Sequence, residues 1–175
     1  MFIRKGNKSK VLRSLRSLFL IATLITNNAI AIEKKILKPV NKYCQGIKKE
    51  VVLGIIRIES NFKNTRKHPN NGIGYMQVRL KTAKWIKCGA RKNRDLHIAW
   101  MNVKCGCEYF KQGLNRFDGD YKKAIAAYNA GDAINCITGR LNNGKRCKIG
   151  KLINQEYVDS VLAYAQGYRC STPKI

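Results

Sequence analysis

The sequence predicts a single domain with an α-dominated fold, either all-α or α+β. Three observations favour this class. Apolar residues recur at helical spacing in several separate segments. Polar, glycine-containing loops join these segments, and almost no stretch shows the apolar–polar alternation of a strand. With 175 residues and no internal repeat, the chain has room for one domain with its own core.

The first predicted helix of this domain covers residues 43–58, and Ile47, Val51 and Ile55 recur along one face of it. Gly54 lies inside the same helix. A glycine there lowers the stability of the helix relative to alanine, unless another element approaches its backbone closely. The pattern therefore predicts a helix with one point of close packing.

The segment over residues 70–78 is glycine-punctuated and too short for a helix, so we expect a turn there. A brief helix is expected over residues 82–86, with Trp85 on its buried face. Asp95 is expected to cap a longer helix that follows it.

Two more helices complete the predicted domain. Asp120 is expected to cap a helix that continues through Ala130, and Gly131 is expected to end that helix. The last helix is amphipathic. Its apolar and aromatic face is made by Tyr157, Val161, Tyr164, Ala165 and Tyr168.

The first 31 residues have the composition of a secretory signal peptide. A cationic start without acidic residues precedes a mostly apolar run over residues 15–25, and Ala29-Ile30-Ala31 places small residues before a cleavage point. An uncleaved membrane anchor is the alternative, but the apolar run is short of the roughly 20 residues that a span needs. We expect cleavage after Ala31, an irregular lead-in over residues 32–42, a domain over residues 43–170 and a tail over residues 171–175.

The formal charge of the sequence is +25 at pH 7, and its isoelectric point is about 10.1. Such a charge concerns partners rather than fold. Nucleic acid is the usual partner of so basic a chain, but no recognition motif is present and the expected export argues against it. An anionic cell envelope is the expected partner, and no nucleic acid is predicted.

Seven cysteines follow the signal peptide, and in a small exported chain they predict disulfides with one thiol left over. Several pairings are open. Cys136 and Cys147 bracket a short loop, Cys44 and Cys170 lie near the two ends of the domain, and Cys88 would pair with Cys105 or Cys107.

A zinc site is the alternative use of these thiols. Its ligands would be Cys88, His97, Cys105 and Cys107. The Cys-x-Cys spacing lacks the usual gap of two to four residues, and there is no second spaced pair. No metal and no cofactor are predicted.

Three short motifs carry the chemistry. Glu59-Ser60 ends an apolar helix, Gly74-Tyr75-Met76-Gln77 forms a glycine-containing turn with a side-chain amide, and Tyr128-Asn129 lies on a helix of small residues. Cleavage of a glycosidic bond needs an acid whose pKa is raised by an apolar setting. Glu59, which follows Ile55 and Ile58, is the best candidate, and no obvious partner carboxylate follows it in the sequence.

In this order the three motifs resemble the signature of the soluble lytic transglycosylase family, over about residues 51–168. The resemblance implies a lysozyme-like fold and a peptidoglycan lytic transglycosylase. Glu59 would protonate the bond between N-acetylmuramic acid and N-acetylglucosamine. It would then act as a base towards the muramyl C6 hydroxyl, which closes a 1,6-anhydro ring. A lysozyme-type muramidase that uses water and a non-catalytic cationic wall-binding protein are the alternatives.

The resemblance also implies which residues bind the substrate. Beside the catalytic Glu59 they are Ser60, Gly74, Tyr75, Met76, Gln77, Tyr128, Asn129 and Tyr157. Met76 is better explained as a core residue than as a ligand contact, whereas Gln77 is equally explained as a side chain bonded to the loop backbone. The sequence departs from the family pattern before Tyr157, at residues 153–155, and in the run over residues 69–73.

The expected partners are peptidoglycan glycan strands and, by the resemblance, a secretion or conjugation apparatus. We expect a monomer in the periplasm, in the cell envelope or outside the cell. No stable membrane insertion is expected after signal cleavage.

Overall fold

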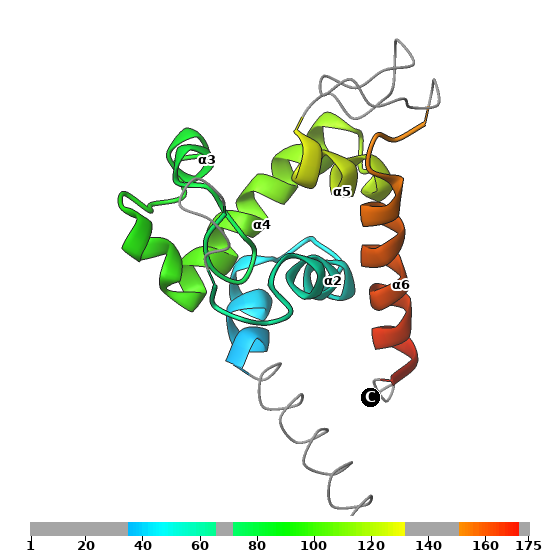
Figure 1. Cartoon of the computed structure of the whole chain (residues 1–175), viewed down its shortest axis with the longest axis horizontal. Coiled ribbons are helices and arrows are strands. Elements are labelled where there is room, and N and C mark those ends of the chain that lie inside the picture. The colour runs from blue at the N-terminus through cyan, green and yellow to red at the C-terminus, as the bar shows by residue number, and fades with distance from the viewer. Residues whose placement is uncertain (1–34, 66–71, 132–150, 172–175) are drawn as a thin grey trace, which may run out of the picture. The chain divides into compact units, whose positions relative to one another are not determined.

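A computed structural model describes residues 35–65, 72–131 and 151–171 of the chain (Figure 1). The chain divides into two compact units, Met1–Leu37 and Lys38–Ile175. The helices from residue 49 onward all belong to the second unit. The predicted signal peptide and the Cys136–Cys147 pairing lie outside the described residues.

The described residues form helices joined by turns, as the sequence predicts, but the helix expected over residues 43–58 begins only at Lys49. The helices are α2 (Lys49–Ser60), α3 (Leu80–Trp85), the short 3-10 helix η1 (Asn93–His97), α4 (Ala99–Arg116), α5 (Tyr121–Ala130) and α6 (Gln155–Ser171). The pairing between Ile73 and Val78, an isolated antiparallel bridge, is the β structure found within these residues. No helix of the described segments is long and apolar enough to cross a membrane.

The expected irregular lead-in is wrong for residues 38–42, which are helical. Val40 and Cys44 are four residues apart and both buried, so this segment presents one apolar face at helical spacing. The expectation of an irregular segment rested on its charged residues and did not take this apolar face into account.

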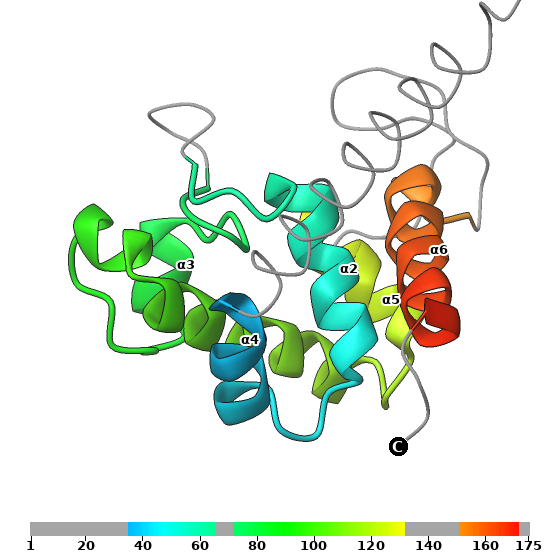
Figure 2. The ribbon, with the colours of Figure 1, turned by 90° about the horizontal axis from the view of Figure 1, so that it is seen from below.

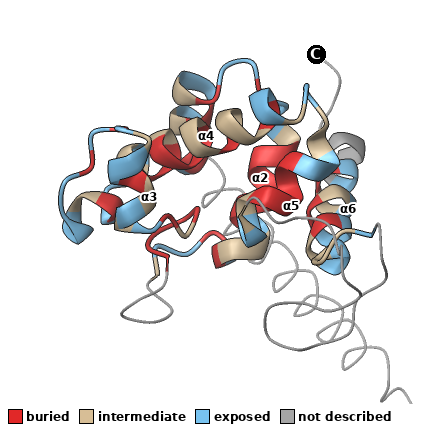
Figure 3. Ribbon diagram, turned by 90° about the horizontal axis from the view of Figure 1, so that it is seen from above, coloured by how far each residue is buried: buried red, intermediate tan, exposed pale blue. Residues whose placement is uncertain are grey.

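Helix α2 carries the core of the domain, and most of its first two turns are buried (Figure 3). It lies beside α6 (Figure 2). The two helices approach each other closely at Gly54, where an added Cβ would lie 2.6 Å from the carbonyl oxygen of Val161. The close approach expected at this glycine is therefore confirmed, and the missing side chain lets the backbones of α2 and α6 come together.

Helix α5 packs mainly against α4 and α6. Its start and end agree with the sequence. The Asp120 carboxylate accepts hydrogen bonds from the backbone N–H groups of Lys122 and Lys123, at 2.9 and 3.1 Å. Gly131 ends the helix with φ 77°, and its N–H donates to the Ala127 carbonyl. Both predicted boundaries of α5 are confirmed.

Two other expectations are wrong. Trp85 is 59% exposed rather than buried, because α3 meets the domain through the small Ala83. Asp95 does not cap α4, which begins behind Ile98 without a side-chain cap. Its carboxylate instead accepts from the N–H groups of Arg91 and Lys92, ahead of η1. These bonds lower the pKa of Asp95.

Two disulfides are present among the described cysteines, and both end on α4. Cys88 bonds to Cys105, one of the two partners that the sequence left open. Cys44 bonds to Cys107, with 5.3 Å between the Cα atoms, so the expected link from Cys44 to Cys170 is wrong. Nearness to the two ends of the domain did not indicate nearness in space.

Candidate active site

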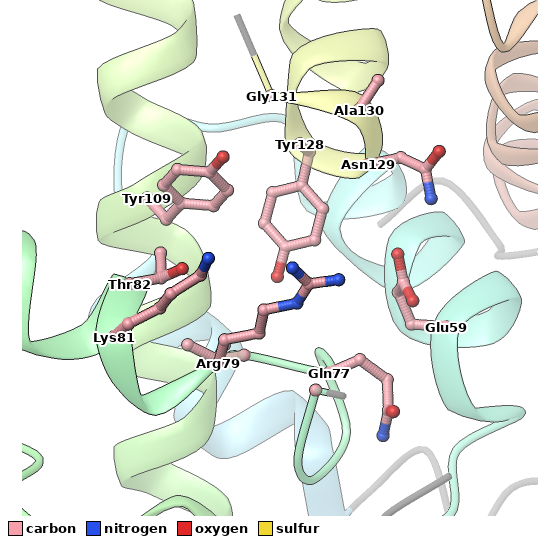
Figure 4. Close-up of a pocket in the computed structure, with 12 residues that line it drawn as sticks. Glu59, Gln77, Arg79, Lys81, Thr82, Tyr109, Tyr128, Asn129, Ala130 and Gly131 are labelled. Atoms are coloured by element: carbon pink, nitrogen blue, oxygen red, sulfur yellow. The ribbon is translucent and has the colours of Figure 1, made fainter. Parts of the chain in front are cut away.

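A cavity of about 480 Å³ opens beside the end of α2 (Figure 4). Side chains from α2, α3, α4 and α5 surround it, together with the turn before α3. The described residues that line it are Glu59, Gly72, Gln77, Val78, Arg79, Lys81, Thr82, Tyr109, Tyr128, Asn129, Ala130 and Gly131. Glu59 is the acidic residue in this set.

Glu59 is held by a tyrosine from the far end of the chain. The Tyr157 hydroxyl donates a hydrogen bond to Oε1 of Glu59 at 2.7 Å. The close packing of α2 on α6 at Gly54 brings the two side chains together. Burial, with the nearby negative charge of Glu59 and the hydrogen bond to it, raises the pKa of Tyr157 well above its ordinary value. Tyr157 therefore stays protonated and remains a donor to the carboxylate.

The turn before α3 is built around an asparagine that the sequence did not single out for this role. Asn102 on α4 is fully buried. Its Nδ2 donates to the carbonyl groups of Ile73 and Leu96, at 2.7 and 2.9 Å. Its Oδ1 accepts from the N–H of Met76 at 2.8 Å. One side chain thus satisfies three backbone groups and fixes the shape of the turn.

Two glycines make room for this turn. Gly74 has φ 75°, and a Cβ there would lie 2.4 Å from Nδ2 of Asn102. A Cβ on Gly72 would lie 1.8 Å from the Gln77 carbonyl oxygen. The glycines therefore serve close packing of the backbone as well as turning. Met76 is fully buried, so its interpretation as a core residue is confirmed.

Gln77 lies at the cavity wall with φ 49°. Its Nε2 donates to the carbonyl oxygens of Thr65 and Gly74, at 3.0 and 2.7 Å. Both donors of the amide are occupied by the loop backbone, which leaves Oε1 as the polar atom of this side chain that could receive a bond from a ligand. The loop-bonding role expected as an alternative is therefore present.

Aromatic side chains form the opposite wall. The rings of Tyr109 and Tyr128 lie 5.3 Å apart, between centroids. The Tyr128 hydroxyl donates to the Met76 carbonyl at 2.7 Å, which ties α5 to the turn. Burial, and the nearby charge of Glu59, raise the pKa of Tyr128 well above its ordinary value. Tyr128 is thus a neutral phenol that connects α5 to the turn before α3 and lies near Glu59.

Ser60 lies behind the cavity wall, whereas Asn129 lies at its surface. Ser60 is buried, and its hydroxyl lies 3.0 Å from the Ile56 carbonyl and 2.7 Å from the Tyr75 carbonyl. It joins the end of α2 to the turn. Asn129 lines the cavity, and its Oδ1 accepts from Nδ2 of Asn154, at 3.0 Å.

The structure separates the predicted site residues into two groups. Glu59, Gln77, Tyr128 and Asn129 line the cavity. The others, which contact the lining residues or the turn rather than the cavity, are Ser60, Gly74, Tyr75, Met76 and Tyr157. Tyr75 is buried rather than at the surface of the cleft.

Sequence reasoning missed four residues of the site: Arg79, Lys81, Tyr109 and the positioning residue Asn102. Tyr109 belongs to the amphipathic α4, and an aromatic residue in this helix was the available sequence signal for an aromatic wall. Nothing in the local pattern marks a buried asparagine or distinguishes two cations of this basic chain from the others.

No group of three or more His, Cys, Asp or Glu side chains gathers as a metal site would require, within the residues that the structure describes. The described lining supplies one carboxyl group, two side-chain amides, two cations and two phenol rings. An oriented carboxyl group beside a polar, partly aromatic wall suits proton transfer to an oxygen of a bound saccharide.

Residues 39–148 match the family model described as Transglycosylase SLT domain. Three solved structures are similar in fold. The 70-kDa soluble lytic transglycosylase in complex with bulgecin A has 22% identity and a TM-score of 0.59, over 76% of this chain and 24% of that one. An inactive mutant of the lytic transglycosylase Slt from Pseudomonas aeruginosa has 21% identity and a TM-score of 0.60, over 81% and 25%.

The third is the 70-kDa soluble lytic transglycosylase Slt70 from Escherichia coli, with 20% identity and a TM-score of 0.51, over 78% of this chain and 20% of that one. The chain therefore spans a quarter or less of the length of these proteins. The likeness concerns the fold of one part of each of them.

Proposed function

Because the chain belongs to the Transglycosylase SLT domain family, we propose that it is a peptidoglycan lytic transglycosylase. It cleaves the β-1,4 bond between N-acetylmuramic acid and N-acetylglucosamine and leaves a 1,6-anhydromuramyl end. The observation that carries this proposal is the cavity in which Glu59, held by Tyr157, is the acid among the described lining residues.

Glu59 acts twice in the proposed reaction. As an acid it gives its proton to the glycosidic oxygen, and the bond from that oxygen to C1 of the muramyl ring breaks. The acetamide of the same sugar stabilises the resulting cation. Glu59, now a carboxylate, takes the proton of the C6 hydroxyl, whose oxygen bonds to C1. The acid is regenerated, and no water is consumed.

The remaining residues bind and orient. Oε1 of Gln77 can accept a bond from a sugar hydroxyl or acetamide N–H, since its Nε2 is bonded to the loop. Asn129 offers its amide at the cavity wall. Tyr157 is a positioning residue, because it acts on the carboxyl group of Glu59 rather than on the sugar.

The single acid supports this reaction over hydrolysis by two carboxylates. Glycosidases with two acids place the second carboxyl group about 5 to 10 Å from the first. Among the described lining residues Glu59 has no such companion. A mechanism that uses the substrate's own acetamide and hydroxyl does not require one.

The test is digestion of purified sacculi, followed by mass spectrometry of the released muropeptides. We expect anhydromuramyl ends, which are lighter than the hydrolysis products by one water. Glu59→Gln keeps the size of the side chain and removes the transferable proton, so lysis should fall by at least about a hundredfold. The inactive state of the mutant Slt from Pseudomonas aeruginosa, in which glutamine replaces a glutamate, supports this choice.

Glu108→Gln is the matched control, because Glu108 is a solvent-accessible acid on α4 that faces Lys104. It should lyse sacculi at the wild-type rate. Hydrated reducing ends would establish the muramidase alternative. Binding without release of fragments by the wild type would establish the non-catalytic alternative.

We further propose that the chain is exported and acts as a monomer in the periplasm, the cell envelope or outside the cell, beside a secretion or conjugation apparatus. The signal-like residues 1–31 support export, and so do the two disulfides on α4. The intact mass of the exported protein tests cleavage after Ala31. Light scattering tests the monomer, and cross-linking in cells that carry such an apparatus tests the partner.

A further inference from the structure

Two cations point into the cavity that holds Glu59. Arg79 and Lys81 both belong to its lining, and Figure 4 shows their side chains directed inward from α3 and the residue before it. In that view the Arg79 guanidinium lies between the Tyr128 hydroxyl and the Glu59 carboxyl group. The proposed reaction at Glu59 does not use either cation.

The local backbone explains their direction. Arg79 precedes α3 with an extended conformation, φ −81° and ψ 142°, and Lys81 lies in the first turn of this helix. Successive side chains of an extended segment point to opposite sides. Val78 is therefore buried in the core, and Arg79 is on the solvent side. Both cations are therefore solvent-accessible yet placed on the wall of the cavity.

Neither cation forms an ion pair with a carboxylate of the described residues, where the salt bridges are Lys104–Glu108 and Lys123–Asp120. The charge of Arg79 nevertheless reaches the cavity wall. Burial raises the pKa of Tyr109, and the positive charges of Arg116 and Arg79 oppose that rise. The two positive charges therefore share the cavity with one described carboxyl group, that of Glu59, and leave an excess of positive charge on its wall.

We propose that Arg79 and Lys81 form a carboxylate subsite that selects glycan strands carrying anionic groups over neutral ones. The inference rests on the proposed function, since it names the chemistry of the strand that enters the same cavity. N-acetylmuramic acid carries a lactyl group that ends in a carboxylate, or in a peptide stem with carboxylates of its own. The planar guanidinium of Arg79 suits bidentate binding of such a group, and Lys81 adds a point charge.

The general charge of the chain does not explain this arrangement. Lys49 and Lys84 are also exposed, but they are absent from the described lining of the cavity. If the basic side chains serve only solubility or attraction to the wall, removal of either pair of cations should have the same effect on strand preference. A subsite treats the pair Arg79 and Lys81 differently from the pair Lys49 and Lys84.

The experiment compares two kinds of glycan strand with the full chain: denuded strands with free lactyl carboxylates and strands with peptide stems, each before and after conversion of its carboxylates to methyl esters. The variants are Arg79→Ala/Lys81→Ala, the charge-keeping Arg79→Lys, and the control Lys49→Ala/Lys84→Ala, which loses the same net charge. The readout is the ratio of kcat/KM on carboxylate strands to that on esterified strands.

We expect the Arg79→Ala/Lys81→Ala variant to lower this ratio about five- to tenfold, the size expected for two solvent-accessible ion pairs. Arg79→Lys keeps the charge but loses the bidentate geometry, so it should lose part of the preference, and the Lys49→Ala/Lys84→Ala control should keep all of it. A loss on denuded strands assigns the lactyl carboxylate. A loss confined to stem-bearing strands assigns the peptide.

An equal ratio in the wild type and the Arg79→Ala/Lys81→Ala variant, for both kinds of anionic strand, overturns the subsite. So does an equal drop on esterified and anionic strands. Calorimetric binding of a denuded tetrasaccharide and of its methyl ester to Glu59→Gln, with and without the two alanine substitutions, reads the subsite without turnover. A wild type that binds with this preference but releases no fragments refutes the proposed function and leaves the subsite standing.

Discussion

The Tyr157 hydroxyl and the Glu59 carboxyl group lie 2.7 Å apart, although 98 positions separate them in the chain. The bond joins the last described helix to the end of α2, so the orientation of the acid depends on how these two helices pack. Anything that shifts α6 along α2 changes the direction in which the acid points.

Tyr157→Phe should therefore lower the rate of sacculus lysis while the fold persists. Loss of one hydrogen bond to a charged group corresponds to about a tenfold to hundredfold fall in kcat, with a smaller change in KM. Tyr164→Phe removes a hydroxyl from the same helix and is the control, since its ring packs against Phe62 and is not among the described lining residues of the cavity. Equal rates for the wild type and Tyr157→Phe would refute the positioning role.

The pH dependence of stability should change at the alkaline end. The pKa values of Tyr128 and Tyr157 are raised in the folded state, so the fold favours their protonated forms. Their contribution is fully present below the unfolded pKa of about 10 and is lost as pH rises above it. Between about pH 10 and pH 11, the free energy of unfolding of the wild type should fall more steeply than that of Tyr157→Phe.

Urea unfolding at a series of pH values measures this difference, and the lysines, which titrate in both proteins, cancel. Parallel curves for the wild type and Tyr157→Phe above pH 10 would contradict the assigned direction of the shift. Below pH 9 the two curves should run parallel.

Gly54→Ala should destabilise the domain, because its Cβ would meet the Val161 carbonyl oxygen at 2.6 Å. Overpacking of this kind costs about 1–3 kcal/mol. Gly167→Ala is the control on α6, where an added Cβ meets nothing within 4 Å. It should instead stabilise the helix by about 0.5–1 kcal/mol. Thermal and urea unfolding separate the two, and a stabilising Gly54→Ala would refute the close approach.

The two disulfides should differ in their contribution. Cys44 and Cys107 are 63 residues apart and close a longer loop than Cys88 and Cys105, which are 17 apart. In the chain-entropy account, loss of the long link costs about 4 kcal/mol and loss of the short link about 3 kcal/mol. Paired alanine substitutions followed by urea unfolding test this order. Peptide mapping that joins Cys44 to Cys170 would contradict the structure.

Local pattern was sufficient where a residue's role depends on its own neighbours in the chain. The cap at Asp120 and the end at Gly131 are set by backbone N–H groups one turn away, and both are confirmed. Gly54 was informative because a glycine within an apolar helix needs an explanation in tertiary packing. The resemblance supplied Glu59 and Tyr157, which periodicity alone would not have joined.

The local sequence pattern did not predict the role of residues whose environment is set by contacts with distant parts of the chain. Trp85 looks like a core residue by composition, but the small Ala83 is the residue that α3 presents to the domain. Asn102 is one polar residue on a helix, and its three bonds become visible only when the turn folds over it. Arg79 points into the cavity because its own backbone is extended ahead of α3 and because of where α3 packs on the domain. Neither is visible in the local sequence.

The contact at Gly54 also affects which substitutions this sequence can tolerate in evolution. There the separation of α2 and α6 is set by main-chain atoms meeting main-chain atoms, since the carbonyl of Val161 occupies the place of a side chain. Such a spacing depends little on which aliphatic residues fill the surrounding interior. Substitutions could accumulate there over evolutionary time while the acid and its phenol stay in register, provided that this one position remains without a side chain.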